Sequence, residues 1–182
     1  MSEWRAFEQS FAGQAVHSGA YRLLVTEAGL QVGFVAKKPP VIIELANLNE
    51  FYEGLWRADC GELWLASPVN GRYIEVNLGP NGAWWACVFS SNRIRDLACP
   101  PPACTDILTE ALGQFWQASL VVPWEDIFRC LQSEEAPTAN VTLILNGCPD
   151  VDPPLENLHS AVPLGAVDFH RPQDWVPLSN LI

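Results

Sequence analysis

Short apolar runs separated by turn-forming residues recur along most of the chain. The runs occupy residues 21–26, 29–36, 41–45, 60–66, 73–78, 84–89, 115–122 and 141–145. Glycine and proline punctuate the intervals, and long segments with a 3.6-residue apolar period are scarce. Short strands at such spacing are typical of an all-β sandwich or barrel. We therefore expect a β-sandwich of two antiparallel sheets, jelly-roll or immunoglobulin-like, with one or two short helices.

Two segments carry the helical signals. Residues 106–114 are long enough for a turn or two of helix. Residues 124–132 follow Pro123 and carry Glu125 and Asp126 in the first turn, which is a good N-terminal signature for a helix.

Two Asn-Gly pairs predict tight hairpin turns in the middle of the chain. Asn70-Gly71 is the strongest short-range signal for a two-residue type I′ turn, and such a turn pairs Leu65 with Val76. A second turn at Asn81-Gly82 pairs Val76 with Cys87. The sequence therefore predicts a three-stranded antiparallel meander.

These registers divide the meander, residues 55–89, into two faces, and a one-residue slip would exchange them. The apolar face, expected to be core, carries Leu63, Leu65, Ile74, Val76, Leu78, Trp85, Cys87 and Phe89. The other face carries Glu62, Trp64, Tyr73, Glu75, Asn77 and Trp84. This mixed face fits a solvated outer surface with a loop over its aromatic rings. It also fits a sugar site, because flat rings with a few polar groups are the usual composition of small-molecule sites.

The net charge of −11 restricts the partners of the chain. An acidic protein repels phosphate backbones and anionic lipid, so we expect neither nucleic-acid binding nor attachment to a membrane surface. No run of about 18 apolar residues predicts a membrane span. Residues 1–5 lack the basic segment and apolar core of a secretory signal, which favours a cytoplasmic location.

The length of 182 residues suits one domain, spanning 1–182. Its cysteines are Cys60, Cys87, Cys99, Cys104, Cys130 and Cys148. They include no Cys-x-x-Cys pair and no zinc-site spacing, so we expect reduced, mostly buried thiols, no cofactor and no metal–thiolate site. Cys99 and Cys104 flank three prolines and are the pair expected to meet under oxidation. The sequence neither predicts nor excludes a structural calcium ion at the acidic loop Asp150-Val151-Asp152.

Four segments together resemble one protein family. Residues 55–65 (LWRADCGELWL) and 71–84 (GRYIEVNLGPNGAW) are similar to the signature of the DOMON-like domains, which are related to the family 9 carbohydrate-binding modules. Residues 122–127 (VPWEDI) and 167–172 (VDFHRP) fit the same family, and the pieces occur in its order.

The resemblance implies a sandwich of two antiparallel sheets and, in the sugar-binding relatives, a sugar held between two tryptophans. One tryptophan of those relatives lies shortly before a hydrogen-bonding glutamate, as Trp56 precedes Glu62 here. Trp175 is the candidate for the second tryptophan because of its late position. Gly61 departs from the family, in which a large residue is expected at this place.

The same resemblance leaves two roles open for Asp168, His170 and Arg171, a structural corner held by ion pairs or a part of the binding site. Haem, which some relatives bind through Met and His ligands, is not expected because Met1 is the one methionine. No Gly-x-Ser-x-Gly elbow, phosphate-binding loop or His-Glu-x-x-His motif is present.

We therefore expect non-catalytic binding of a carbohydrate or similar small polar ligand on a tryptophan-lined face. The expected ligand-binding residues are Trp56, Glu62, Trp64, Glu75, Asn77, Trp84 and Trp175. One alternative is a protein-interaction or self-association module that uses the tryptophan-rich patch. A weaker alternative is a glycoside hydrolase-like enzyme with Glu62 and Glu75 as its paired carboxylates.

Overall fold

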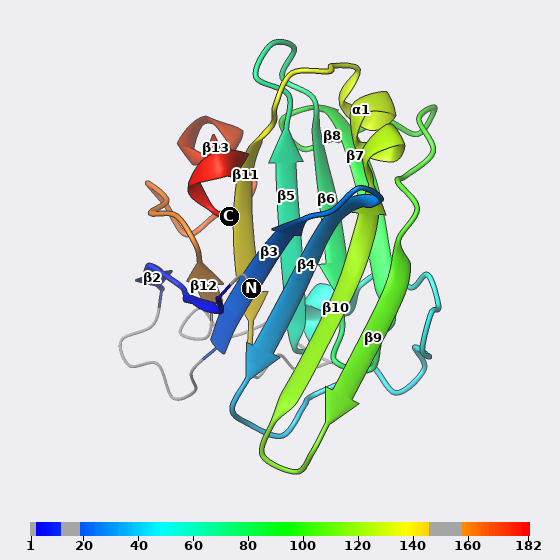
Figure 1. Cartoon of the computed structure of the whole chain (residues 1–182), viewed down its shortest axis with the longest axis vertical. Helices are drawn as coiled ribbons and strands as arrows, with labels where there is room; N and C mark the ends of the chain where they lie inside the picture. Colours follow the sequence, from blue (N-terminus) through cyan, green and yellow to red (C-terminus); the bar gives the residue numbers. More distant parts are fainter. Residues whose placement is uncertain (1–2, 12–18, 146–157) are drawn as a thin grey trace.

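Two antiparallel sheets packed face to face form the molecule, and the expected β-sandwich is confirmed (Figure 1). The computed structural model describes residues 3–11, 19–145 and 158–182. Sheet A has the order β1 (Arg5–Ala6), β3 (Gly19–Val25), β4 (Gly29–Ala36), β10 (Trp116–Pro123), β9 (Thr105–Ala111). Sheet B has the order β2 (Gln9–Ser10), β12 (Leu158–Ser160), β11 (Thr138–Ile144), β5 (Cys60–Ala66), β6 (Tyr73–Leu78), β7 (Trp84–Ser91), β8 (Ile94–Arg95), and β13 (Val176–Pro177) pairs with β11.

The core between the sheets follows from alternation along the strands, because successive side chains of a strand point to opposite faces. The largest contributions come from fully buried side chains of both sheets: Leu23, Leu30, Val32, Phe34 and Leu120 from sheet A, and Leu63, Leu65, Ile74 and Val76 from sheet B. Each such side chain contributes roughly 1.5–3 kcal/mol to the free energy of folding.

The first hairpin of the meander has a longer turn than expected. Leu65 pairs with Ile74 rather than Val76, so the predicted register is wrong by two residues, although the two faces are kept. Pairing ends where the Ser67 N–H donates to the Arg72 carbonyl (2.9 Å). Pro68 follows at once and has no N–H with which to extend the ladder.

The register of the second hairpin differs from the prediction and exchanges the two faces of β7. Leu78 pairs with Trp84 rather than Trp85, so the predicted register is wrong by one residue. The Gly82 N–H donates to the Gly79 carbonyl (3.0 Å), and Gly82 adopts φ +81°. This geometry is the three-residue hairpin loop in which a left-handed glycine follows a turn. Trp85, Cys87 and Phe89 therefore lie on the outer face of sheet B, and Trp84, Ala86 and Val88 lie on the opposite face.

One of the two helical predictions is confirmed and the other is wrong. Helix α1 (Trp124–Leu131) is confirmed: it begins after Pro123 and ends at Gln132, which adopts φ 50°. Its apolar side chains Ile127, Cys130 and Leu131 are fully buried and close one end of the core. The prediction of helix at 106–114 is wrong, because Thr105–Ala111 is edge strand β9. Residues 41–45 form a loop rather than the expected strand. No helix in the described ranges is long and apolar enough to cross a membrane.

The C-terminal segment, residues 161–182, packs over part of the outer face of sheet B. Its short helices η3 (Pro172–Asp174) and η4 (Leu178–Asn180) flank β13. The Trp175 ring lies 5.7 Å from the Trp64 ring and 5.7 Å from the Tyr73 ring, measured between centroids. This segment leaves one side of the outer face open, and the candidate site lies there.

Candidate functional site

A pocket of about 470 Å³ opens on the outer face of sheet B beside the C-terminal segment. Strands β5 and β6 supply its floor through Glu62, Trp64 and Glu75. One wall comes from helix η1 (Leu55–Arg57) and strand β7, and the facing wall comes from residues 167–170. Arg93 and Arg95 line the pocket next to β7, and Ile144 and Leu158 complete the lining.

Two tryptophans form the first wall. The rings of Trp56 and Trp85 meet edge to face, with centroids 5.3 Å apart and an interplanar angle of 67°. The Arg95 guanidinium lies over the Trp85 ring at 5.1 Å and pairs with Glu53 (2.7 Å). The wall therefore combines aromatic surface with a cation held at its edge.

The loop that leads to Trp56 is anchored by a buried ion pair. Lys38 and Asp59 are 3 % and 1 % exposed, and the Lys38 ammonium contacts the Asp59 carboxylate. The same Asp59 oxygen accepts a hydrogen bond from the Val41 N–H (2.9 Å). Asp59 immediately precedes β5, so this pair holds residues 38–41 against the start of the floor strand and fixes the chain on both sides of η1.

Two buried carboxyl groups occupy the floor. Glu62 is 2 % exposed and accepts a hydrogen bond from the Thr142 hydroxyl (2.6 Å), which accepts one from Trp64 Nε1 (2.8 Å). Glu75 is 6 % exposed and accepts one from Asn77 Nδ2 (3.0 Å). The two glutamates come from adjacent strands and are diagonal neighbours in the ladder, because Glu62 pairs with Asn77 and Trp64 pairs with Glu75.

Burial makes this pair of acids weak. Burial and the neighbouring Glu75 raise the pKa of Glu62 to about 8, and burial raises the pKa of Glu75 to about 7. The pair therefore retains a proton at neutral pH. Asn77 lies directly opposite Glu62 in the ladder, and its buried Oδ1 has no hydrogen-bond partner among the described residues. A protonated Glu62 offers the kind of donor that this oxygen lacks.

The facing wall holds a neutral histidine. The Arg93 N–H donates to the Tyr73 hydroxyl (2.9 Å), and this hydroxyl shares a second hydrogen bond with His170 Nδ1 (2.8 Å). When the Tyr73 hydroxyl donates to Nδ1, His170 carries its proton on Nε2, which lies 3.9 Å from a Glu75 oxygen. Burial, with Arg93 as a second cause, lowers the pKa of His170 to about 4. Asp168 accepts from the Arg93 guanidinium (2.6 Å) and from the His170 N–H (2.9 Å).

Four of the seven expected site residues line this pocket: Trp56, Glu62, Trp64 and Glu75. Asn77 is fully buried beneath the pocket, and its Nδ2 donates a hydrogen bond to Glu75. Trp84 lies on the other face of sheet B, where its ring meets Phe51 at 4.9 Å. Trp175 is 6 % exposed and packs behind Trp64 rather than in the pocket.

The structure divides the corner formed by Asp168, His170 and Arg171. Asp168 and His170 line the pocket, whereas Arg171 contacts Asp174, which also accepts from the Gly165 N–H (3.0 Å). Arg171 therefore belongs to the structural corner.

Sequence reasoning did not find several lining residues: Trp85, Phe89, Arg93, Arg95 and Phe169. Trp85 and Phe89 were assigned to the core by the one-residue error of register. Pro80 in the second turn was the available signal, because proline favours the first position of a type I turn and thus the longer loop. Phe169 comes from a segment whose position no local pattern specifies.

In the three described ranges, no group of three or more His, Cys, Asp or Glu side chains is placed to hold a metal ion. The cysteines in these ranges, Cys60, Cys87, Cys99, Cys104 and Cys130, are free. Cys148 and the acidic loop Asp150-Val151-Asp152 lie outside the described residues.

Comparisons with known proteins find the fold in solved structures. A protein from Bacteroides uniformis ATCC 8492, to which carbohydrate binding is provisionally ascribed, aligns with a TM-score of 0.70 at 14% identity, over 96% of this chain and 84% of that chain. A family 9 carbohydrate-binding module from Caldicellulosiruptor kristjanssonii in complex with glucose aligns with a TM-score of 0.59 at 9% identity, over 96% and 81% of the two chains.

A structure of a family 9 module from the same organism in complex with cellotriose aligns with a TM-score of 0.54 at 9% identity, over 88% and 73% of the two chains. Searches of protein-family models and of curated proteins find no match to the sequence. The wider DOMON-like resemblance stays a prediction. The chain has the β-sandwich fold seen in the family 9 carbohydrate-binding modules.

Proposed function

We propose that the pocket on sheet B binds a carbohydrate without transforming it. The observation that carries this proposal is the combination of the Trp56–Trp85 wall with buried hydrogen-bonding groups in a space of about 470 Å³. Pockets of this size, mainly apolar with a few convergent polar groups, are typical of small-molecule sites. The structural neighbours that bind glucose and cellotriose lend support through a shared fold.

The polar groups of the pocket suit the hydroxyls of a neutral sugar. A protonated carboxyl on the floor donates one hydrogen bond and accepts others. His170 Nε2–H is a further donor, and the gap of 3.9 Å to Glu75 is longer than a hydrogen bond, so a ligand hydroxyl can bridge the two groups. The aromatic wall supports the C–H face of the sugar ring.

The positions of the two glutamates favour binding over hydrolysis. Glycosidases place two carboxyl groups on either side of the scissile bond. Glu62 and Glu75 instead both belong to one floor, as diagonal neighbours on adjacent strands, and Thr142 and Asn77 engage them from within the protein. The self-association alternative needs Trp64 and Trp84 on one exposed patch. Trp64 is 1 % exposed, and Trp84 lies on the opposite face of the sheet.

Adjacent tryptophans provide a matched test. Trp85→Leu removes the pocket ring and Trp84→Leu removes its neighbour on the other face, with the same change of side chain. Titration calorimetry with a panel of mono- and disaccharides is expected to show that Trp85→Leu weakens binding about fivefold to tenfold, because ring stacking contributes roughly 1 kcal/mol. Trp84→Leu should leave the affinity within about twofold.

Two outcomes contradict the proposal. One is the absence of binding by the parent protein across the panel at millimolar concentration. The other is release of product from aryl glycosides that is lost in Glu62→Gln, which would identify a hydrolase. A dimer in size-exclusion chromatography that only the Trp84→Leu substitution dissociates would favour the interaction module.

A further inference from the structure

A second hollow lies on the outer face of sheet A, on the other side of the sandwich from the pocket. Its volume is about 460 Å³, and its lining includes Trp4, Arg22, Gln31, Glu110, Gln117 and Ser119. All of these residues except Trp4 belong to strands and alternate with core residues such as Leu23 and Leu120, so their side chains point away from the core. Figure 1 shows β3, β4, β10 and β9 in front, with helix α1 at one end rather than over them.

The floor of the hollow has a glycine, Gly33, at its centre, where no side chain fills the space. Arg22, Gly33 and Ser119 form one row across three neighbouring strands, because Arg22 pairs with Gly33 and Gly33 pairs with Ser119. A Cβ atom on Gly33 would lie 3.4 Å from Trp4 Cη2 and 3.6 Å from Ser119 Cβ. The indole of Trp4 therefore rests over the glycine, and its side chain stays 40 % exposed.

The polar groups at the two sides differ in character. The Arg22 guanidinium lies 5.0 Å from the Trp4 ring centroid, and its Nε is buried without a hydrogen-bond partner among the described residues. On the other side, Gln117 Nε2 donates to Glu110 Oε2 (2.9 Å), which orients the amide and the carboxylate. The hollow thus presents donors without acceptors at one side and acceptor oxygens at the other.

This composition selects a class of ligand. A phosphate or another strong anion would lie close to Glu110 on a chain of net charge −11. An apolar ligand would cover Gln31, Ser119 and the Arg22 Nε without offering them partners, which is costly for polar groups removed from water. A neutral polyhydroxylated molecule matches both sides, since each hydroxyl donates and accepts, and its C–H faces suit an indole.

We propose that the hollow on sheet A is a second carbohydrate site, which binds a neutral oligosaccharide against Trp4. Arg22 donates to ring or hydroxyl oxygens, and the Gln117–Glu110 pair accepts hydroxyl protons. This site is independent of the pocket on sheet B, because no side chain named as lining one of them also lines the other.

The test separates the two sites by reciprocal variants. Trp85→Leu weakens the pocket on sheet B, and Arg22→Met weakens the hollow on sheet A while keeping a long side chain. An array of neutral and acidic oligosaccharides first identifies binders of the Trp85→Leu protein. Each binder is then titrated into isotope-labelled protein, and the indole N–H signals are followed by NMR. The Trp4 signal is expected to shift, and Arg22→Met should weaken this binding about fivefold or more.

Three results overturn the second site. They are the absence of any neutral oligosaccharide that shifts the Trp4 signal at millimolar concentration, unchanged affinity in Arg22→Met, and binding restricted to acidic sugars. The proposal for sheet B fails separately, when no sugar shifts the Trp56 and Trp85 signals of the parent protein, or when Trp85→Leu leaves the affinity measured at Trp56 unchanged. A shift of Trp4 alone in the parent protein therefore supports the second site and contradicts the first.

Discussion

Gly61 shows how a single residue controls the packing of the two sheets beneath the pocket. The ring of Phe34 from sheet A occupies the space in front of Gly61, and a Cβ atom at this position would lie 2.3 Å from Phe34 Cγ. The large residue that the family resemblance led us to expect at this place is therefore supplied from the facing sheet. Since Glu62 is the next residue, this contact also sets the depth of the floor.

Gly61→Ala is expected to lower the free energy of unfolding by about 1–3 kcal/mol, because overpacking displaces a buried aromatic ring. Urea denaturation measures the change. Gly33→Ala is the matched control, since its added Cβ meets its nearest neighbour at an ordinary 3.4 Å. Its effect should stay within about 0.5 kcal/mol. Equal losses in the two variants would contradict the role of the Phe34 contact.

The buried acids predict an unusual dependence of stability on pH. Glu62 and Glu75 have pKa values raised to about 8 and about 7, so the native state keeps protons that the unfolded chain has already released. The free energy of unfolding should therefore fall as pH rises from about 6.5 to about 8, by roughly 1–3 kcal/mol. Histidine does not obscure this range, because unfolded histidine is mostly neutral above about 6.5.

Denaturation at several pH values checks this expectation. The double variant Glu62→Gln, Glu75→Gln should lose the slope, whereas Glu44→Gln, a surface change, should retain it. A stability that rises between pH 6.5 and 8 in the parent protein would show that the two carboxyls are ionised in the native state.

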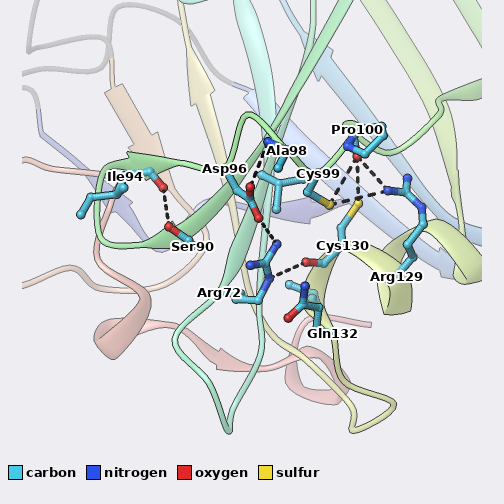
Figure 2. Close-up of polar contacts among 12 residues, drawn as sticks. Arg72, Ser90, Ile94, Asp96, Ala98, Cys99, Pro100, Arg129, Cys130 and Gln132 are labelled. Carbon is cyan, nitrogen blue, oxygen red and sulfur yellow. Dashed lines mark hydrogen bonds and ion pairs between the residues drawn. The ribbon is translucent and has the colours of Figure 1, made fainter.

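At the scale of elements, the first hairpin caps the end of helix α1 (Figure 2). The last carbonyls of a helix have no partner within it and favour positive charge. Arg72 Nε donates to the Cys130 carbonyl (2.9 Å), and Asn70 Nδ2 donates to the Leu131 carbonyl (2.9 Å). Arg72 Nη2 also pairs with Asp96 (2.8 Å), which follows β8. One turn thus joins the helix to the edge of sheet B.

Arg72→Lys is expected to cost about 1–3 kcal/mol of stability, because one ammonium cannot serve both the carbonyl and the carboxylate in their fixed geometry. Arg171→Lys is the control at a more exposed pair three residues apart, where the change should stay below about 1 kcal/mol. Thermal unfolding followed by circular dichroism compares them. A loss at Arg171 as large as that at Arg72 would argue against the capping role.

At the scale of the whole molecule, alternation and turn residues were sufficient to predict the sandwich and the bounds of β4, β5 and β6. They were insufficient to predict the register of β7, because residues 84–89 (WWACVF) are apolar on both faces and no polar side chain marks the register. Strand β9 was missed because its pairing with β10 overrides a weak local preference. The floor of the site could therefore be predicted, whereas its wall from residues 167–170 depends on packing over long sequence separation.

The two hollows on opposite faces have a consequence for how such a molecule would behave among polymers. A short ligand cannot reach around the sandwich, so each face would engage a different glycan strand. One protein molecule would then act as a bridge. On a surface with many chains, rebinding through the second face would slow its departure well beyond what either contact provides alone.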